Sequence, residues 1–514
     1  MTPITADSNT LDSIPEAQTS RSPMHSGWTL ALVSLALFMV TLDNLIVGVA
    51  IPSIRVDLGA SLESLEWTVN AYTLTYAIFL MPAAALGDRF GRRRMFMIGL
   101  SIFTLASMVA AAAPTIDALV GARALQGFGA AIVTPLTLTL LAEAFPGERR
   151  GLALGVWSGV SGLGVALGPV IGGAVLEGFG SWQWIFGVNV PIGITVVLLT
   201  KWRLAESRGE IRTLDLRGLA LVSTGLTGLT YAIVRGQNLG WGTAAILIPG
   251  ITGVLLLVAF IAWEKRALHP TLPLRFFRSR GFSSTSVVSF AMFFGVFGSI
   301  FYLSQFFQTA QGYSPLEAGI RTLPWTAMPI FIAPLAGIFS DRIGARPFMA
   351  VGLTLQAIAI TWISQIAEPT TPYGEMIIPF MIAGAGMAMV FAPAANAVLA
   401  SVRPSEAGLA SGATNAIREV GGVMGVSMLG VLFAANGSYA SPQAYSDGVA
   451  AALPLGAAVL AIGAIAALFV PGLERMRADA ELHAQADVDH MGSVASARPS
   501  APITGTPKLK AGNA

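Results

Sequence analysis

The amino-acid sequence predicts an all-α membrane protein, and three observations support this fold class. Of the 514 residues, 54% are hydrophobic and only 11% are charged, whereas charged residues make up about a quarter of an ordinary soluble protein. The mean hydropathy is +0.68. The apolar residues form continuous runs of about 20 residues, the length of helix that crosses roughly 30 Å of hydrocarbon. Because the runs are continuously apolar, whereas apolar and polar residues alternate along the strands of a barrel, helices are favoured over barrel strands.

Fourteen such runs are expected to be transmembrane helices. In chain order they are Trp28–Ala50, Trp67–Gly87, Met95–Ala113, Ile116–Ala142, Gly151–Leu176, Trp184–Lys201, Leu216–Arg235, Ala244–Trp263, Ser283–Phe307, Leu316–Phe339, Phe348–Ala367, Met376–Ala400, Gly408–Ala434 and Gly448–Val470. The first run is too long for a signal peptide, so we expect an uncleaved span. In the flanking segments 1–27 and 471–514, apolar residues do not recur at the regular spacing of a helix or a strand. These segments are predicted to be disordered tails.

The loop charges predict the orientation of these helices. Lysine and arginine residues concentrate in the loops that follow even-numbered helices, whereas only Arg55 and Arg235 follow odd-numbered ones. Cytoplasmic loops carry the excess of positive charge in membrane proteins. We therefore expect both termini on the cytoplasmic side of a cell membrane.

An internal repeat divides the chain. The pattern Asp88-Arg89-Phe90-Gly91 after the second helix returns as Asp341-Arg342-Ile343-Gly344 after the tenth. Each copy closes the second helix of a six-helix set, so residues 28–201 and 283–470 are expected to form two bundles. Residues 202–282 then hold two inserted helices with their linkers. Duplicated halves are typical of secondary transporters, which bind substrate between the halves.

Five motifs carry a resemblance to a known family. They are Leu42–Pro52 on the first helix, Leu86–Arg94 after the second, Arg123–Gly129 on the fourth, Gly164–Gly173 on the fifth and Ser181–Gly193 at the start of the sixth. With these motifs the chain resembles the major facilitator superfamily, and within it the fourteen-helix drug:proton antiporters. The chain departs from the family pattern at Leu45, Gly48, Ala84 and Gln183.

The resemblance implies a fold and a function. The fold would be two six-helix bundles with two inserted helices. The function would be export of hydrophobic or cationic drugs by proton antiport through alternating access, and the motif on the fifth helix resembles exporters rather than importers. An exporter of one native metabolite or antibiotic, and a proton-coupled importer, remain alternatives.

Asp43 is the sharpest candidate for chemistry, because a carboxylate in an apolar span costs roughly 2.5–3.5 kcal/mol to insert. Counting residues from the helix ends places Arg123 at the same depth, about 10 Å below the outer boundary. Gln126 shares the helix face of Arg123. The resemblance implies that Asp43 takes part in proton coupling and that Arg123 is its partner. The alternative is a static ion pair that fixes helix packing.

A second polar group lies on the thirteenth run. Asn415 and Arg418 share a face of that helix. For Glu419 two roles are open: it carries a second proton or a cation, or it forms a salt bridge at the cavity entrance. We assign Asn44, Gln126, Trp157, Asn415 and Arg418 to the substrate cavity.

Two further motifs predict moving parts. In the motif Leu86–Arg94 after the second helix, which we call the first loop motif, we expect a tight turn at Gly91 and a helix N-cap at Asp88. We assign gating to this motif and its repeat, at Asp88, Arg89, Gly91, Arg92, Asp341 and Arg342. On the fifth helix, Pro169 removes a helical hydrogen bond and the small residues permit close packing. We expect a hinge or seal at Gly164, Gly168, Pro169 and Gly172, with ordinary tight packing as the alternative.

The composition and motifs also exclude several functions. The sequence has no cysteine, and its four histidines lie in the tails or a connecting loop, so we expect no metal site and no cofactor. It contains no phosphate-binding loop of an ATPase and no hydrolase motif, so we expect neither an ATP-driven pump nor an enzyme. A net charge of +2 predicts no nucleic-acid partner. The expected partners are small-molecule substrates, protons and the lipid bilayer, and the expected state is a monomer.

Overall fold

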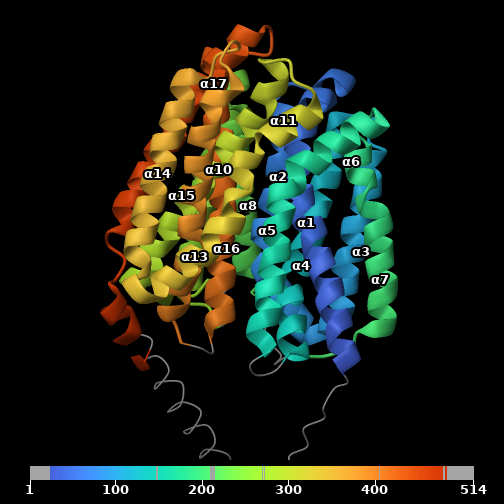
Figure 1. Ribbon diagram of the computed structural model, residues 1–514. Coiled ribbons are helices and arrows are strands. Elements are labelled where there is room, and N and C mark those ends of the chain that lie inside the picture. The colour runs from blue at the N-terminus through green and yellow to red at the C-terminus, as the bar shows by residue number, and fades with distance from the viewer. Residues whose placement is uncertain are drawn as a thin grey trace, which may run out of the picture.

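A computed structural model of the chain describes residues 23–145, 149–208, 215–268, 270, 272–403, 406–478 and 481–482. Within these ranges the structure is built from helices, without a strand, which confirms the all-α fold class (Figure 1). The helices are α1 Pro23–Leu58, α2 Leu62–Phe90, α3 Arg92–Ala111, α4 Ile116–Ala144, α5 Arg149–Phe179, α6 Trp184–Gly187, α7 Asn189–Arg203, α8 Leu216–Leu239, α9 Ala244–Glu264, the 3-10 helix η1 Leu274–Arg278, α10 Arg280–Thr309, α11 Pro315–Arg321, α12 Leu323–Thr326, α13 Met328–Ile343, α14 Ala345–Ile366, α15 Tyr373–Ala400, α16 Ala407–Asn436 and α17 Pro442–Ala467.

Thirteen segments of the described chain are long and apolar enough to cross a membrane. The expected second span is missing from these thirteen. It corresponds to α2, which is 29 residues long and carries Glu63, Glu66 and Asn70 near its start; the side chains of Met81 and Ala84 in this helix lie outside the described part of the structure. Fourteen spans therefore remain a prediction.

Two of the expected spans are broken rather than continuous. The sixth run forms α6 and α7, which meet at Val188; Pro191 lacks the N–H that would bond to the carbonyl group of Gly187. The tenth run forms α11, α12 and α13, and the last two of these have a proline in the first two helical positions, Pro324 and Pro329. Proline suits the start of a helix and interrupts the interior.

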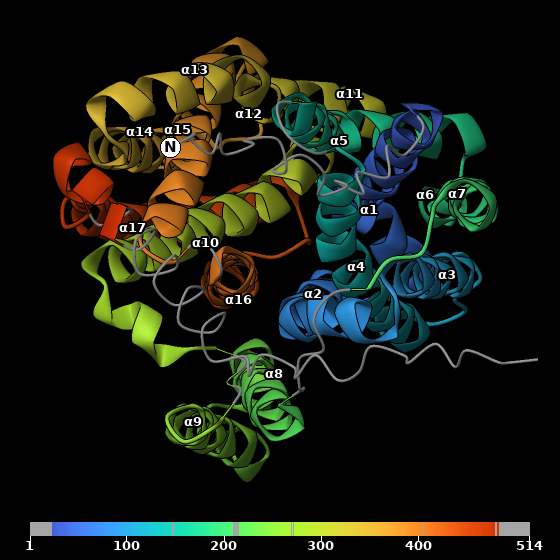
Figure 2. The same cartoon turned by 90° about the horizontal axis from the view of Figure 1, so that it is seen from below.

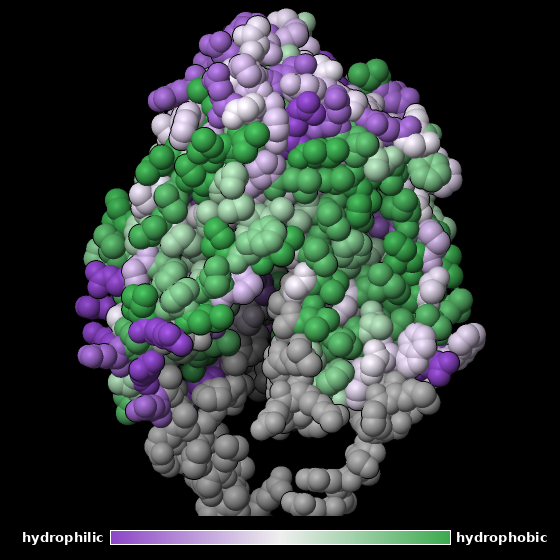
Figure 3. Space-filling model, in the orientation of Figure 1, coloured by the Kyte–Doolittle hydropathy of each residue, from purple (hydrophilic) through white to green (hydrophobic). Residues whose placement is uncertain are grey.

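The helices form two groups. Helices α1 to α7 pack on one another, as do α10 to α17, and we call these groups the N-terminal and C-terminal halves. The inserted helices α8 and α9 pack together at one edge of the molecule, where α8 contacts α2 and α16 (Figure 2). Many apolar side chains of α9 are exposed, including Leu247, Ile251 and Leu255. On the face shown in Figure 3, hydrophobic side chains form a broad band below a hydrophilic cap, as expected for a surface in lipid.

The described contacts between the halves include a set on the side of the molecule away from the first residues of α1, the upper side in Figure 1. There α2 packs on α16, α5 on α11, and α1 on α10. Side chains of the C-terminal half bond to backbone carbonyl groups of α1: Ser304 Oγ to Gly48 O at 3.3 Å and Gln308 Nε2 to Val49 O at 2.8 Å. We call this set of contacts the distal seam.

The chain ends differ in part from the expected tails. Helix α1 begins at Pro23, so residues 23–27 are helical, and residues 473–478 are helical as well. These short segments extend helices or pack on the bundle, which a search for apolar runs alone does not detect. Residues 1–22 and 483–514 lie outside the described chain.

Candidate functional site

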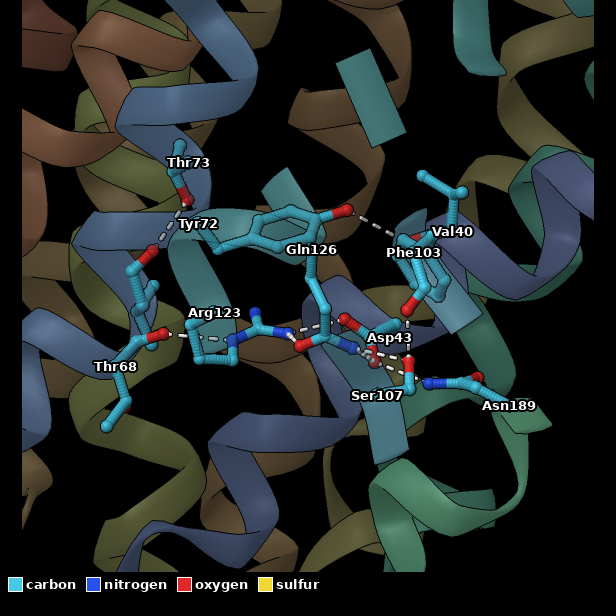
Figure 4. Close-up of polar contacts among 11 residues, drawn as sticks. Val40, Asp43, Thr68, Tyr72, Thr73, Phe103, Ser107, Arg123, Gln126 and Asn189 are labelled. Atoms are coloured by element: carbon cyan, nitrogen blue, oxygen red, sulfur yellow. Dashed lines mark hydrogen bonds and ion pairs between the residues drawn. The ribbon is translucent and has the colours of Figure 1, made fainter. Parts of the chain in front are cut away.

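Asp43 lies at the centre of a buried polar cluster in the N-terminal half (Figure 4). Arg123 Nη1 donates to Asp43 Oδ2 at 2.5 Å, and Asn189 Nδ2 donates to Asp43 Oδ1 at 2.6 Å. Gln126 Nε2 donates to Asp43 Oδ1 at 3.2 Å and to Ser107 Oγ at 2.8 Å. All of these side chains have 0% of their surface exposed, so the structure isolates the carboxyl group from solvent.

Four segments bring this cluster together. Asp43 comes from α1, Ser107 from α3, Arg123 and Gln126 from α4, and Asn189 from the first residue of α7. Residues three apart on a helix share a face, which is why Arg123 and Gln126 both reach the carboxylate. The break between α6 and α7 places Asn189 at a helix start beside Asp43.

The guanidinium group of Arg123 is held on several sides. Its Nε donates to the backbone carbonyl group of Thr68 at 3.0 Å, and its Nη1 also donates to Gln126 Oε1 at 3.0 Å. The Tyr72 ring lies 4.3 Å from Arg123 Cζ and the Phe186 ring 5.7 Å, within the range of cation–π attraction. Its Nη2 has no hydrogen-bond partner among the described residues.

This arrangement couples charge to structure. A buried carboxylate and a buried guanidinium compensate each other, and removing one charge leaves the other uncompensated at a cost of about 3–5 kcal/mol. Protonation of Asp43 has the same electrostatic effect as removing its charge. The two buried charges of the cluster are therefore stable only together.

A small cavity lies beside this cluster, between the two halves. It is lined by Asn44, Leu45 and Gly48 of α1, Pro169 of α5, and residues of α10, α12 and α15 that include Phe297, Ser304, Trp325 and Phe380. Its volume is about 40 Å³, whereas pockets for drug-sized ligands span roughly 300–1,000 Å³. Of the residues assigned to the substrate cavity, Asn44 lines this space.

The structure places the other assigned cavity residues elsewhere. Gln126 belongs to the Asp43 cluster, and Trp157 Nε1 donates to Thr137 Oγ1 at 3.0 Å. On α16, Arg418 Nη1 donates to Asn415 Oδ1 at 3.2 Å, as their shared face predicts. The Arg418 guanidinium lies 5.9 Å from the Phe293 ring and 5.7 Å from the Phe391 ring.

Glu419 is half-buried on α16. Its Oε2 is buried and has no hydrogen-bond partner among the described residues, and no ion pair joins it to Arg418 in the described chain. The structure does not bring Glu419 into the Asp43 cluster.

The first loop motif forms an ion-paired turn. Arg92 Nη2 lies 2.7 Å from Asp88 Oδ1, and Arg92 also pairs with Glu143 at the end of α4. Gly91 and Gly344 occupy corresponding places in the two repeats and have φ of +105° and +101°, a conformation that favours glycine. Arg89 and Arg342 are exposed, and the side chain of Asp341 lies outside the described part of the structure.

The expected N-cap at Asp88 is wrong. Asp88 lies inside α2, and the N-cap of α3 is Gly91, which makes no side-chain cap. Instead, the Glu206 carboxylate accepts from the backbone N–H groups of Arg93 at 3.0 Å and Arg94 at 3.2 Å. A carboxylate at a helix N-terminus satisfies free N–H groups and the helix dipole, and it need not come from the adjacent sequence.

The small residues of α5 pack against other backbones. A Cβ on Gly164 would lie 3.2 Å from Phe38 O, and one on Gly172 would lie 2.7 Å from Ile46 Cγ1, both on α1. A Cβ on Gly168 would lie 3.0 Å from Leu45 Cβ. Across the distal seam, a Cβ on Gly319 of α11 would collide with Pro169 O, so the two backbones are in close contact. Helix α5 continues through Pro169 from Arg149 to Phe179.

Sequence reasoning missed several residues of the site. Asn189 lies in a quoted motif, but its contact with Asp43 depends on the break between α6 and α7. Ser107 and the carbonyl group of Thr68 carry no sequence signal, because short polar side chains and backbone groups occur in many spans. Glu66 lies just before the expected second span and is 3% exposed.

Two bundled halves inside a membrane chain are typical of transporters. Residues 33–426 and 285–486 match the family described as the Major Facilitator Superfamily. The chain therefore belongs to the Major Facilitator Superfamily and is a transporter, not an enzyme.

Curated relatives are similar over most of the chain. The multidrug resistance protein Stp of Mycobacterium tuberculosis is 34% identical over 409 residues, which cover 79% of this chain and 76% of that protein. The tetracenomycin C resistance and export protein of Streptomyces glaucescens is 34% identical, with 82% and 78% covered. The cephamycin export protein CmcT of Amycolatopsis lactamdurans is 36% identical, with 80% and 86% covered.

A solved structure shares the fold. The chain superposes on a bacterial homolog of the human lysosomal transporter Spinster, in an inward-facing and unoccupied conformation, with a TM-score of 0.64 and 18% identity. The match covers 89% of this chain and 99% of the other. The family match confirms the predicted superfamily, whereas membership of its fourteen-helix branch remains a prediction.

Proposed function

We propose that this protein exports hydrophobic or cationic drugs in exchange for protons, by alternating access. The observation that carries the proposal is the contact between Asp43 and Arg123, 2.5 Å apart with neither side chain exposed. A titratable group that is isolated from water and balanced by one cation meets the requirement for a proton carrier. Intramembrane ionisable residues of this kind mark ion pathways.

The proton cycle follows from charge balance. Protonation of Asp43 leaves Arg123 without its counter-charge, which favours a conformation in which the guanidinium group finds another partner or water. Loss of the proton restores the buried pair. Each conformation is stabilised by a different protonation state, and this difference is what allows a proton gradient to drive a conformational cycle.

The two halves would exchange access between the membrane faces. With both termini in the cytoplasm, the distal seam is the outer side, and this conformation is closed there. The cavity of about 40 Å³ beside Asn44 is too small for a drug-sized molecule, so binding requires the halves to separate further around it. The glycine contacts of Gly164, Gly168 and Gly172 hold α5 to α1 during that movement.

We assign the remaining candidates to the same cycle. Asn44, Asn415 and Arg418 would contact substrate as the cavity enlarges, and Glu419 would carry a second proton or a cationic substrate. The Asp88–Arg92–Glu143 turn would open and close on the cytoplasmic side. We expect a monomer in the cell membrane, with no cofactor.

The names of the relatives support export and leave its breadth open. One relative is named for multidrug resistance, whereas two are named for a single antibiotic, tetracenomycin C or cephamycin. Export of one native antibiotic is therefore the second candidate. A panel of compounds tested with and without a proton gradient separates the two: several unrelated substrates support the drug exporter, and one substrate supports the dedicated exporter.

The proton role is tested in inverted membrane vesicles. We expect Asp43→Asn to abolish pH-driven efflux while the protein is still made and folded. Asp117→Asn is the matched control, because Asp117 is an exposed residue in the first turn of α4. Undiminished proton-driven efflux in the Asp43 variant would remove this residue from its assigned role, and proton-driven accumulation in the opposite direction would indicate an importer.

A further inference from the structure

A second buried carboxyl group lies in the distal seam, apart from the Asp43 cluster. Glu66 of α2 is 3% exposed, and its Oε1 accepts a hydrogen bond from Tyr302 Oη at 2.9 Å. Tyr302 lies on α10 and is 0% exposed. The bond therefore joins the N-terminal half to the C-terminal half.

Residues of the C-terminal half pack closely around the Glu66 carboxyl group. A Cβ at Gly430 of α16 would collide with Glu66 Oε1, so the glycine leaves room for the carboxyl group in this position. The Tyr302 ring stacks on Phe433 with 5.0 Å between ring centroids, and Tyr445 Oη donates to the Tyr302 carbonyl group at 2.9 Å. One helical turn further along α2, Asn70 Nδ2 donates to Ser427 Oγ of α16 at 2.9 Å. Glu66 thus belongs to a complementary interface.

Among the described residues, the charged and titratable groups around Glu66 supply no cation that pairs with it. Glu63, on the same helix, forms an ion pair with Arg235 of α8, and Arg123 of α4 pairs with Asp43. Tyr439 donates to Gln305 Oε1 at 2.6 Å, and its ring lies 4.2 Å from the Arg55 guanidinium. No ion pair among the described residues includes Glu66. Glu66 also lies in the second turn of α2, beyond the first turn where a helix dipole favours an anion.

In the closed seam, a negative charge on Glu66 is energetically unfavourable. Closing the halves moves the carboxyl group from water to a site whose described partner is one neutral hydroxyl group. Burial of an ionised carboxylate without a cation costs far more than burial of a neutral, hydrogen-bonded carboxyl group. The closed seam therefore favours the protonated form, and an open, hydrated seam favours the ionised form.

We propose that Glu66 is a proton-binding site of the distal seam, separate from Asp43, and that the two halves close over it when it carries a proton. The proposal rests on alternating access as proposed above. The ligand is a proton from the medium on the distal side. Its release accompanies separation of α2 from α10 and α16, so this site sets how readily the seam opens at a given pH.

The test measures the seam directly, without transport. The sequence contains no cysteine, so Val56→Cys and Thr370→Cys introduce two unique spin-label sites at exposed positions of the two halves. Distances between the labels are measured by pulsed electron spin resonance in lipid nanodiscs across a series of pH values. All variants are made in an Asp43→Asn background, so that the remaining pH response does not come from Asp43.

In that background we expect the open-to-closed ratio to rise with pH, by up to about tenfold per pH unit for one linked proton. We expect Glu66→Gln, which mimics the protonated form, to remain closed at every pH, and Glu66→Asp to keep the pH response. Tyr302→Phe keeps the carboxyl group but removes its hydrogen bond, so we expect a preserved response with a larger open fraction. This variant decides the matter if Glu66→Gln does not fold.

The same measurement can overturn the proposal. A pH response that is equal with and without Glu66→Gln would show that another group controls the seam, and absence of a response in the Asp43→Asn background would do so as well. Failure of drug export in vesicles would count against the proposed function but not against this site, because the distances are measured without substrate or gradient.

Discussion

Arg123 donates a hydrogen bond to Asp43 across 2.5 Å, from α4 to α1, with both side chains fully buried. The pair places one positive and one negative charge in the interior of a membrane protein, where neither is hydrated. Each charge is therefore stable only while the other is present, and this mutual dependence is the physical basis of the first two predictions.

The charge pair predicts strong coupling in a double-mutant cycle. Arg123→Gln or Asp43→Asn alone leaves one buried charge unpaired, and we expect each to lower the free energy of unfolding by roughly 3–5 kcal/mol. The double variant removes both charges, so its loss is expected to be smaller than the sum of the single losses. Thermal unfolding in detergent measures all four proteins, with exposed Arg94→Gln as the control. Additive losses would show that the two side chains do not depend on each other.

Asn189 is predicted to stabilise the carboxylate through its 2.6 Å hydrogen bond. Asn189→Ala removes the donor, and we expect a loss of about 1–3 kcal/mol of unfolding free energy. Asn189→Asp places a second carboxylate against Asp43, so its loss should be larger. The control is Asn436→Ala, because the Asn436 amide group lies at an exposed helix end and its described bond is to the backbone carbonyl group of Leu432. Equal effects of the two Asn189 variants would contradict an electrostatic role.

Gly173 is predicted to permit closure of the distal seam. A Cβ at this position would collide with the Leu316 backbone of α11, so Gly173→Ala should shift the spin-label distances described above towards the open seam. Gly178→Ala on the same helix is a matched control, because a Cβ there would have no neighbour within 4 Å among the described residues. An unchanged closed fraction in the Gly173 variant would mean that α5 and α11 can shift at no cost.

Glu406 provides a pH-dependent contribution to stability outside the spans. Its carboxylate pairs with Arg275 of η1 and with Arg403 Nη2 at 2.7 Å. Burial alone would raise the pKa of Glu406, but the hydrogen bonds from Arg403 and the charge of Arg275 outweigh burial and hold the pKa below its ordinary value of 4.5. Because the folded state favours the ionised form, this contribution is fully present above pH 4.5 and disappears as the pH falls through the lowered pKa.

Glu406→Gln therefore should lower the melting temperature at neutral pH and have a vanishing effect in acid. Thermal unfolding of the wild type and the variant over a pH series measures the difference, with exposed Glu474→Gln as the control. A difference that grows as the pH falls would reverse the sign of the argument and refute it.

The class of protein and the main pair of the site could be predicted from the sequence. Membrane spans are readable because lipid requires long apolar helices, and residue counting along two spans placed Asp43 and Arg123 at one depth. The superfamily was readable from short motifs, because glycine, proline and charged residues at tight turns and close contacts tolerate few replacements.

Which helices contact one another became visible in the folded structure and could not be predicted from the sequence. Asn189 reaches Asp43 because the sixth run breaks at Val188, and Glu206 caps α3 from more than a hundred residues away in the chain. Tyr302 meets Glu66 across 236 positions of sequence. Contacts of this kind depend on how surfaces of separate helices pack, and no local pattern of residues encodes that packing. The Glu66 carboxyl group, near the start of α2, therefore becomes part of the distal seam only when the two halves are assembled.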